Sequence, residues 1–349
     1  MIRSEFCART FGLAVLVAVL STAATATTYG LRYLPEVDGY LEIPLSINDR
    51  SVVAFSVDSG GQAHTLIWSE DTGIEVTGAV SPPRDINDDG MIVGQDGNDC
   101  RAWAWTKAGG SVDLGTLGGP YAGALAVNNL GQAVGGATLT DYSEHAFIWD
   151  AETGMRDLGV FAGGDYACAY DINDDGLAVG SARRADGDIH AFLWSEDYGM
   201  QDMGVLGGTF SCATAINRSG QVVGISSTAD GGEAVFLWTA DQGMRSLIPL
   251  VGRVAINPSA INDSGTVVGT IEDMDRDTEE AFVWTQETGL TILGPGEAFD
   301  INNAGQIVGI AVEIGVAPRA VIWQPVPEPA SLFVLCAGLV PLVVRRRRG

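Results

Sequence analysis

A dipeptide of isoleucine or valine followed by asparagine returns seven times along the chain, and this repeat constrains the fold more than any other feature. The intervals between consecutive asparagines are 39, 41, 45, 44, 45 and 40 residues. In six of the seven copies a glycine follows three residues later, and a second glycine follows four residues after the first. The asparagines are Asn48, Asn87, Asn128, Asn173, Asn217, Asn262 and Asn302.

A second repeated segment ends in tryptophan and keeps the same rhythm, as in HAFIW (145–149) and HAFLW (190–194). Short segments such as GMRDL (154–158) follow it. A period of 40 to 45 residues with four short strands is typical of one β-propeller blade. We therefore predict an all-β chain that forms a seven-bladed β-propeller of four-stranded blades. A leucine-rich or right-handed solenoid is the alternative.

The two ends of the repeat region complement each other. The last copy has no fourth strand after Trp323, where the sequence QPVP (324–327) breaks the chain. A spare apolar segment, TYGLRYL (28–34), precedes the first copy instead. Such a strand can fill the missing place and close the ring, so that no sheet edge is left open. This match favours a ring over a solenoid.

The turn after each asparagine has its own physical explanation. Glycine can adopt the left-handed conformation that closes a type I turn with a bulge, and the asparagine side chain can bond the backbone two residues on. Two copies nevertheless read DINDDG and have the spacing of the first calcium ligands in a calcium-binding loop. These candidate calcium ligands are Asp85, Asn87 and Asp89 in one copy and Asp171, Asn173 and Asp175 in the other.

The calcium interpretation competes with a simple solvated turn. A full calcium loop needs a glutamate at position 12, where this chain has Asp96 and Ala182. The same asparagine and glycine also occur without acids, as in NRSG (217–220). The solvated turn is therefore the default, and no other cofactor is expected.

Cysteine and histidine positions suggest packing more than chemistry. Cys168 and Cys212 each precede their repeat's asparagine by five residues, which places them at equivalent points on the inner strands of adjacent blades. They are candidates for an inter-blade disulfide, or else two small buried residues. His64, His145 and His190 each lie four residues before their blade's tryptophan, and we expect them to pack at strand ends rather than bind a metal.

A ligand-binding face is suggested by aromatic residues and by acidic loops. Tyr121, Tyr166 and Phe210 follow Gly-Gly or similar turns and suit sugar stacking or a protein partner. The loops between the second and third strands are acidic, and in a propeller they share a face with the connections between blades. This face is either a surface for cations and cationic ligands or a solvating rim.

Charge and motifs exclude several function classes. The formal net charge is −25, and residues 27–325 carry 13 Lys and Arg against 42 Asp and Glu, a net of −29. Such a surface disfavours nucleic acid and anionic lipid as partners. No nucleophile elbow, HExxH, phosphate loop or zinc pattern is present, so no catalytic residue is nominated. No cluster of differing residues that breaks the repeat rule is evident; the insert at 250–258 comes nearest.

The N-terminus has the features of an export signal. Arg3 and Arg9 precede an apolar run at 11–20, which is too short to span a bilayer as a helix. The triplet Ala24-Thr25-Ala26 fits the small-x-small cleavage rule. We predict a signal peptide over residues 1–26.

The C-terminus carries three ordered parts: a Pro-Glu-Pro triplet, an apolar run at 332–344 and an arginine tail that would hold its end in the cytoplasm. The residues are Pro327, Glu328, Pro329, Arg345, Arg346, Arg347 and Arg348. Residues 326–349 closely resemble the PEP-CTERM sorting signal of Gram-negative bacteria. The resemblance implies transient inner-membrane anchoring, processing by exosortase, and arrival at the cell surface or in an exopolysaccharide matrix.

The repeat region, residues 27–325, resembles the HAF repeat family of bacterial extracellular proteins, although several copies lack the histidine. This resemblance implies an extracellular location, since the family has no established common activity. We therefore expect a non-enzymatic, exported binding or structural protein that associates with exopolysaccharide or with surface proteins. A glycan lyase or hydrolase and a protein-binding scaffold are the alternatives.

Overall fold

The computed structural model describes residues 27–36, 42–59, 62–79, 81–97, 99–249, 254–313 and 315–326. Within these ranges all the secondary-structure elements are β-strands. This part of the chain holds no helix that is long and apolar enough to cross a membrane. The predicted signal peptide, the sorting motif from Pro327 onward and the start of the 250–258 insert lie outside the described residues.

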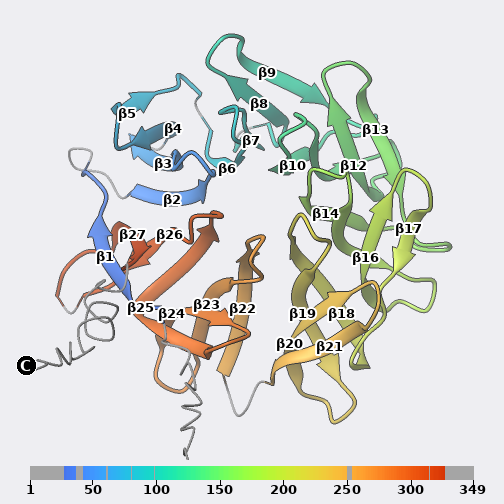
Figure 1. Cartoon of the computed structure of the whole chain (residues 1–349). Helices are drawn as coiled ribbons and strands as arrows, with labels where there is room; N and C mark the ends of the chain where they lie inside the picture. The colour runs from blue at the N-terminus through green and yellow to red at the C-terminus, as the bar shows by residue number, and fades with distance from the viewer. Residues whose placement is uncertain are drawn as a thin grey trace, which may run out of the picture.

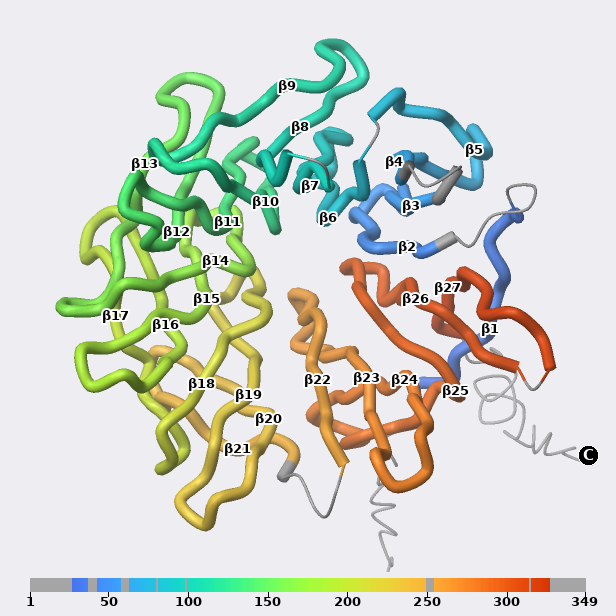
Figure 2. Tube along the Cα trace, turned by 180° about the vertical axis from the view of Figure 1, so that it is seen from behind, coloured from blue at the N-terminus to red at the C-terminus, as the bar shows by residue number. Residues whose placement is uncertain are grey.

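The strands form successive antiparallel units of four that stand around a common centre (Figures 1 and 2). Each unit begins with the strand that ends at the Ile-Asn or Val-Asn dipeptide, and we number the repeats one to seven in chain order. These inner strands are β2 (Glu42–Ile47), β6 (Pro83–Ile86), β10 (Ala122–Val127), β14 (Ala167–Ile172), β18 (Gly207–Ile216), β22 (Val254–Ile261) and β25 (Gly289–Ile301).

The other strands of each unit follow outward from the centre. The second strands are β3 (Val53–Ser59), β7 (Ile92–Gln95), β11 (Ala133–Thr138), β15 (Ala178–Arg183), β19 (Val222–Thr228), β23 (Val267–Asp273) and β26 (Ile307–Ala311). The third strands, which carry the tryptophans, are β4 (Gln62–Ser69), β8 (Ala102–Thr106), β12 (Glu144–Asp150), β16 (Ile189–Ser195), β20 (Glu233–Thr239), β24 (Thr278–Thr285) and β27 (Arg319–Pro325). The outer strands are β5 (Gly73–Val76), β9 (Gly110–Gly115), β13 (Gly154–Gly159), β17 (Gly199–Asp202), β21 (Gly243–Pro249) and β1 (Tyr29–Tyr33).

The hydrogen-bonded sheets are open, and two of them extend over more than one unit. Strand β25 is shared, because its first half pairs with β24 and its second half pairs with β26. A single parallel bridge between Ile189 and Phe210 connects β16 to β18. The radial arrangement of antiparallel units is that of a β-propeller.

The N-terminal strand β1 lies against the last strand of the chain. It pairs antiparallel with β27, from Tyr29 opposite Pro325 to Tyr33 opposite Val321. The contact continues at Leu34, whose N–H donates to the carbonyl O of Ala320 at 2.9 Å and whose side chain is buried. The spare N-terminal segment therefore takes the place predicted for it.

The core lies between neighbouring units rather than inside any one of them. Phe147, Phe192, Phe236 and Phe282 come from the same place on successive third strands, and each is fully buried. The cluster around Phe192 contains side chains of repeats three and four, including Ile148. Strands packed on both faces need apolar residues on both, which explains their continuous apolar runs.

Both repeated glycines have a structural cause. The first has φ between 74° and 78° in all six repeats that carry it, as the turn predicted, and Ser51 holds φ 60° in the first repeat. The second lies against the neighbouring inner strand. A Cβ at Gly135, for example, would overlap the carbonyl O of Gly123. In the six repeats that carry this glycine, a side chain there would collide with the inner strand; the first repeat has Phe55 at this position, opposite Pro44.

Candidate functional site: a central channel

The seven asparagine side chains form a closed ring of hydrogen bonds around the centre. Nδ2 of each donates to the backbone O of the asparagine in the next repeat, at 2.9 to 3.2 Å, and Asn302 donates to Asn48. Oδ1 accepts N–H bonds from its own turn, as Asn87 does from Asp89 and Met91. All seven side chains are buried. Each amide therefore stabilises its own turn and joins its repeat to the next.

A second ring surrounds the mouth of the channel at the turn end. The residue after each asparagine lines this mouth, where the cavity has a volume of about 260 Å³. Backbone N–H groups donate to the side chain of the next repeat, as from Asp49 to Asp88 and from Asp88 to Asn129. The residues are Asp49, Asp88, Asn129, Asp174, Arg218, Asp263 and Asn303. They leave a mainly acidic mouth at this end.

Three carboxylates line the channel further in, two residues before their asparagines. Asp85 accepts N–H bonds from Ile86 at 2.7 Å and from Val127 of the next repeat at 2.8 Å. Asp171 bridges repeats four and five in the same way. Asp300 bridges repeats seven and one, and the Ser46 hydroxyl lies 2.7 Å from Asp85 Oδ1 and 2.8 Å from Asp300 Oδ2, so it can donate its one proton to either carboxyl group. These acids tie adjacent repeats together at the centre.

The channel acids hold protons more tightly than ordinary carboxyl groups. Burial is the main cause and raises the pKa of Asp171 to about 7, although its two N–H donors oppose the shift. Burial and the nearby charge of Asp85 raise the pKa of Asp300 to about 6. The pKa of Asp85 is also raised by burial.

The predicted calcium loops are not assembled. Asp85 faces backbone N–H groups in the channel, Asn87 belongs to the amide ring, and Asp89 forms an ion pair with Arg50 at 3.2 Å. In the other copy Asp171 and Asn173 have the same channel and ring partners, while Asp175 is exposed at the turn. Among the described residues no group of three or more His, Cys, Asp or Glu could hold a metal ion. The acids in DINDDG thus serve inter-repeat contacts or face solvent.

The opposite end of the channel breaks the repeat rule. Every inner strand has a β-bulge three residues before its asparagine, and the bulge residue lines the channel there. Bulges commonly redirect a side chain beside a functional site. The bulge residues are Leu45, Arg84, Leu125, Tyr170, Thr214, Ser259 and Phe299. Six residue types in seven repeats form the differing cluster that sequence inspection missed.

This variable mouth opens on the face of the molecule that carries the acidic loops. Inner strands run toward the asparagine turns, so their beginnings and the connections between repeats lie at the other end. A cavity of about 160 Å³ joins the bulge residues to Asp85, Asp171 and Asp300. Arg84 is exposed there, while Tyr170 and Phe299 are half-buried. The mouth thus offers one cationic and two aromatic side chains above three carboxyl groups.

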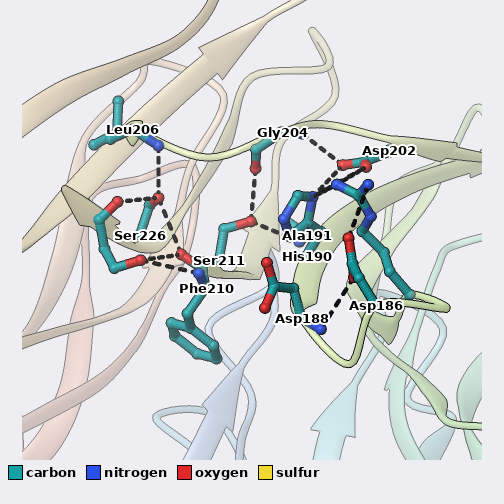
Figure 3. Close-up of polar contacts among 12 residues, drawn as sticks. Asp186, Asp188, His190, Ala191, Asp202, Gly204, Leu206, Phe210, Ser211 and Ser226 are labelled. Carbon is teal, nitrogen blue, oxygen red and sulfur yellow. Dashed lines mark hydrogen bonds and ion pairs between the residues drawn. The ribbon is translucent and has the colours of Figure 1, made fainter. Parts of the chain in front are cut away.

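The three aromatic candidates lie at equivalent positions on this face but do not converge. Tyr121, Tyr166 and Phe210 each precede their asparagine by seven residues, near the starts of β10, β14 and β18. Tyr121 is 50% exposed and lines a groove. The hydroxyl of Tyr166 lies 3.0 Å from that of Tyr170 at the mouth. The carbonyl O of Phe210 accepts from the Ser226 hydroxyl (Figure 3). Its backbone N–H donates to Oγ of Ser227.

Two of the three repeated histidines contact an aspartate on the adjacent outer strand. Nδ1 of His145 lies 2.9 Å from both oxygens of Asp157 on the outer strand, and His190 lies equally close to Asp202. Arg101 and Asp113 make the matching contact in repeat two. The expected packing of these histidines at the strand ends is confirmed for this pair of repeats.

A serine beside the His190–Asp202 pair does not complete a catalytic triad. Ser211 belongs to β18 and faces β16 (Figure 3). Its hydroxyl accepts from Ala191 N–H of β16 at 2.8 Å and donates to Gly204 O at 2.7 Å. Ser211 is fully buried. Its hydroxyl proton is thus committed to a backbone carbonyl, and no substrate can reach the oxygen.

The cysteines of the described residues are free thiols. Cys168 and Cys212 occupy equivalent places on β14 and β18, as predicted, but the candidate disulfide between them is not formed. Burial raises the pKa of the Cys168 thiol and raises that of Cys212 to about 11. Both thiols therefore stay protonated at neutral pH and react slowly.

Neither a protein-family model nor a curated protein matches the chain. Among solved structures, virginiamycin B lyase from Staphylococcus aureus is 11% identical, with 86% of this chain and 99% of that chain covered and a TM-score of 0.57. The β-propeller domain of the Trilobed protease from Pyrococcus furiosus is 10% identical, with 81% and 95% covered and a TM-score of 0.57. TolB from Acinetobacter baumannii is 12% identical with a TM-score of 0.44; 73% of this chain and only 54% of that chain are covered. The first two likenesses show that the chain has an all-β, β-propeller fold.

Proposed function

We propose that this chain is an exported, non-enzymatic protein of the cell surface or extracellular matrix that binds exopolysaccharide at the variable mouth of its channel. One observation carries the proposal. The asparagines that build the scaffold are the same in all repeats, whereas the bulge residues at the mouth differ. A symmetric scaffold needs the same residue in every repeat. A specific ligand needs different residues at the place where the repeats meet. The bulge positions supply that asymmetry.

The chemistry of the mouth suits a hydroxyl-bearing polymer. Tyr170 and Phe299 offer ring faces, and aromatic side chains contribute large contact areas at little conformational cost. Thr214 and Ser259 add hydroxyl groups. The net charge of −25 repels polyanions, so a neutral polymer is favoured over an acidic one or over nucleic acid. Binding in this way needs no cofactor.

The scaffold behind the site is, in this proposal, a seven-bladed ring over residues 27–325, closed by β1. The ring of seven asparagine amides supports the count, since it returns from Asn302 to Asn48. The pairing of β1 with β27 supports the closure. Open edges of both strands would otherwise face solvent.

The proposed route to the surface rests on the two ends of the sequence. A signal peptide at 1–26 would direct export, and the PEP-CTERM-like segment at 326–349 would anchor the chain transiently until exosortase processes it. The resemblance of the repeats to the HAF family supports an extracellular location. These features support a location at the surface, or in the matrix, of a Gram-negative bacterium.

Co-sedimentation of residues 27–325 with exopolysaccharide purified from the producing cells tests the proposal. We expect binding by the parent protein and at least about tenfold weaker binding when Tyr170 and Phe299 are both replaced by alanine. Tyr198→Ala is the matched control, because Tyr198 is 78% exposed and lies in the turn between β16 and β17, away from the channel. Absence of binding, with calcium and with chelator alike, would overturn the polysaccharide proposal. Loss on chelation alone would show that cations bridge protein and polymer.

A glycan lyase or hydrolase remains the second candidate, and the same asymmetric mouth favours it. Asp171 lies there with a pKa of about 7, a value suited to proton transfer. Some similar structures are enzymes, but their low identity transfers no activity. Incubating polymer with the protein and following chain length by size-exclusion chromatography separates the two candidates. Shortened chains would replace the binding proposal with an enzymatic one, whereas unchanged chains that still bind the protein would retain it. A protein-binding scaffold would instead leave the polymer both unbound and intact.

A further inference from the structure

A groove beside the third repeat adjoins the variable mouth. It has a volume of about 260 Å³ and runs between Gln95 of β7, Tyr121 and Glu144 of repeat three, and Cys168 of β14. Leu125 lines both this groove and the mouth of the channel. The groove and the mouth therefore adjoin at Leu125.

The groove exists because two side chains are missing. Gly123 of β10 pairs directly with Gly136 of β11. At these two positions every other repeat has at least one side chain larger than glycine, and the gap is peculiar to repeat three. The corresponding residues are Ile43 and Ser56, Pro82 and Gln95, Cys168 and Ser181, Cys212 and Ile225, Asn257 and Thr270, and Glu297 and Ile310.

The side chain of Glu144 occupies the floor of this gap. A Cβ added at Gly136 would collide with the Glu144 carboxylate and would lie 3.1 Å from Sγ of Cys168. Burial raises the pKa of Glu144, which is half-buried. Within the described part of the chain, neither this carboxylate nor the amide of Gln95 has a hydrogen-bond partner. Both side chains line the groove and can form hydrogen bonds with a ligand there.

We propose that this groove binds one neutral, hydroxyl-bearing sugar unit of the polymer, with Tyr121 as the stacking wall and with Glu144 and Gln95 bonding its hydroxyl groups. This inference rests on the proposed function and names the subsite that selects the sugar. The volume is below the roughly 300–1,000 Å³ of drug-sized sites, so it fits a single small unit. Among the residues that the structure describes, no Lys or Arg lines the groove, so an acidic sugar would find no cationic partner there and would face the Glu144 carboxyl group.

Filling the groove is the first test. Gly123→Ser adds a side chain whose Cβ has the flexible Gln95 side chain as its nearest neighbour, at 3.1 to 3.4 Å, and that side chain can move aside, so the fold should tolerate it. Gly97→Ala is the matched control, because a Cβ at this glycine of the same face meets nothing within 4 Å. The probe is the neutral oligosaccharide fraction from partial acid hydrolysis of the producing cells' exopolysaccharide, titrated into the full chain by calorimetry. We expect Gly123→Ser and Tyr121→Ala each to weaken binding at least about tenfold, and Gly97→Ala to leave it unchanged.

The role of Glu144 is tested by two substitutions. Glu144→Gln keeps hydrogen-bonding groups but removes the charge, and should bind within about threefold of the parent protein. Glu144→Ala should lose about tenfold. If both variants lose binding equally while glucosamine binds only the parent protein, the groove takes a cation and the sugar proposal is overturned.

The outcomes also separate this inference from the proposed function. If the parent protein sediments with polymer and Gly123→Ser binds the oligosaccharides as well as the parent does, the groove proposal alone fails. If the parent protein binds neither polymer nor oligosaccharide, both proposals fail. Melting temperatures of all variants, measured alongside, identify any that lose binding through unfolding. If Gly123→Ser is one of these, Tyr121→Ala decides the result, because Tyr121 is exposed.

Discussion

At the scale of single residues, one asparagine side chain performs two tasks, and this predicts a large cost for its loss. Asn173 accepts N–H bonds from Asp175 and Leu177 and donates to Asn217 O at 3.1 Å. Asn173→Ala leaves these buried groups without partners, so we expect the free energy of unfolding to fall by roughly 2–4 kcal/mol in urea denaturation. Asp175→Ala is the control in the same turn, since Asp175 is exposed, and should change it by less than about 0.5 kcal/mol. Equal stability of the two variants would show that the amide ring contributes little.

At the scale of elements, strand β1 covers the open edge of β27, and its removal should both destabilise the protein and expose that edge. A chain that begins at residue 35 lacks five paired residues and the buried Leu34 side chain. We expect a lower melting temperature and concentration-dependent association, because an unpaired strand edge recruits other chains. Size-exclusion chromatography and thermal unfolding measure both effects. A chain that begins at Thr28 keeps β1 and is the control; a truncated chain that stays monomeric and equally stable would rule out a closing role for β1.

At the scale of the whole molecule, the sequence predicts what is local and periodic. The spacing of Asn87, Gly90 and Gly94 gives the turn, and the count of repeats gives the number of hairpins. The amide ring was not predicted, because a hydrogen bond between Asn87 and Asn128 depends on packing between units 41 residues apart. The interpretation of Asp85 as a calcium ligand missed its contact with Val127 for the same reason, because Val127 lies in the next repeat. Aligning the repeats on their asparagines and reading the third residue upstream would have found the variable mouth.

The channel acids also make the stability of the whole ring depend on pH. The pKa of Asp171 is about 7 in the folded protein, against an ordinary value of 3.8, so the folded state holds a proton that the unfolded state releases. This contribution is fully present below about pH 4 and is lost as the pH rises through about 7. Asp300 adds to it through its folded pKa of about 6.

We therefore expect the free energy of unfolding to fall between pH 4 and pH 7, and to fall less steeply in Asp171→Asn, which carries no titrating group there. The variant should also be less stable at low pH, because an amide NH2 would replace one of the oxygens that accept N–H bonds from Ile172 and Ile216. The slope, not the absolute stability, is thus the informative quantity, and urea unfolding at intervals from pH 4 to pH 8 measures it. The chain's net charge of −25 also lowers stability as pH rises, so Asp175→Asn, which removes one exposed carboxylate, is the control for that general repulsion. Identical slopes for the two variants would mean that Asp171 titrates in the channel as it does in water.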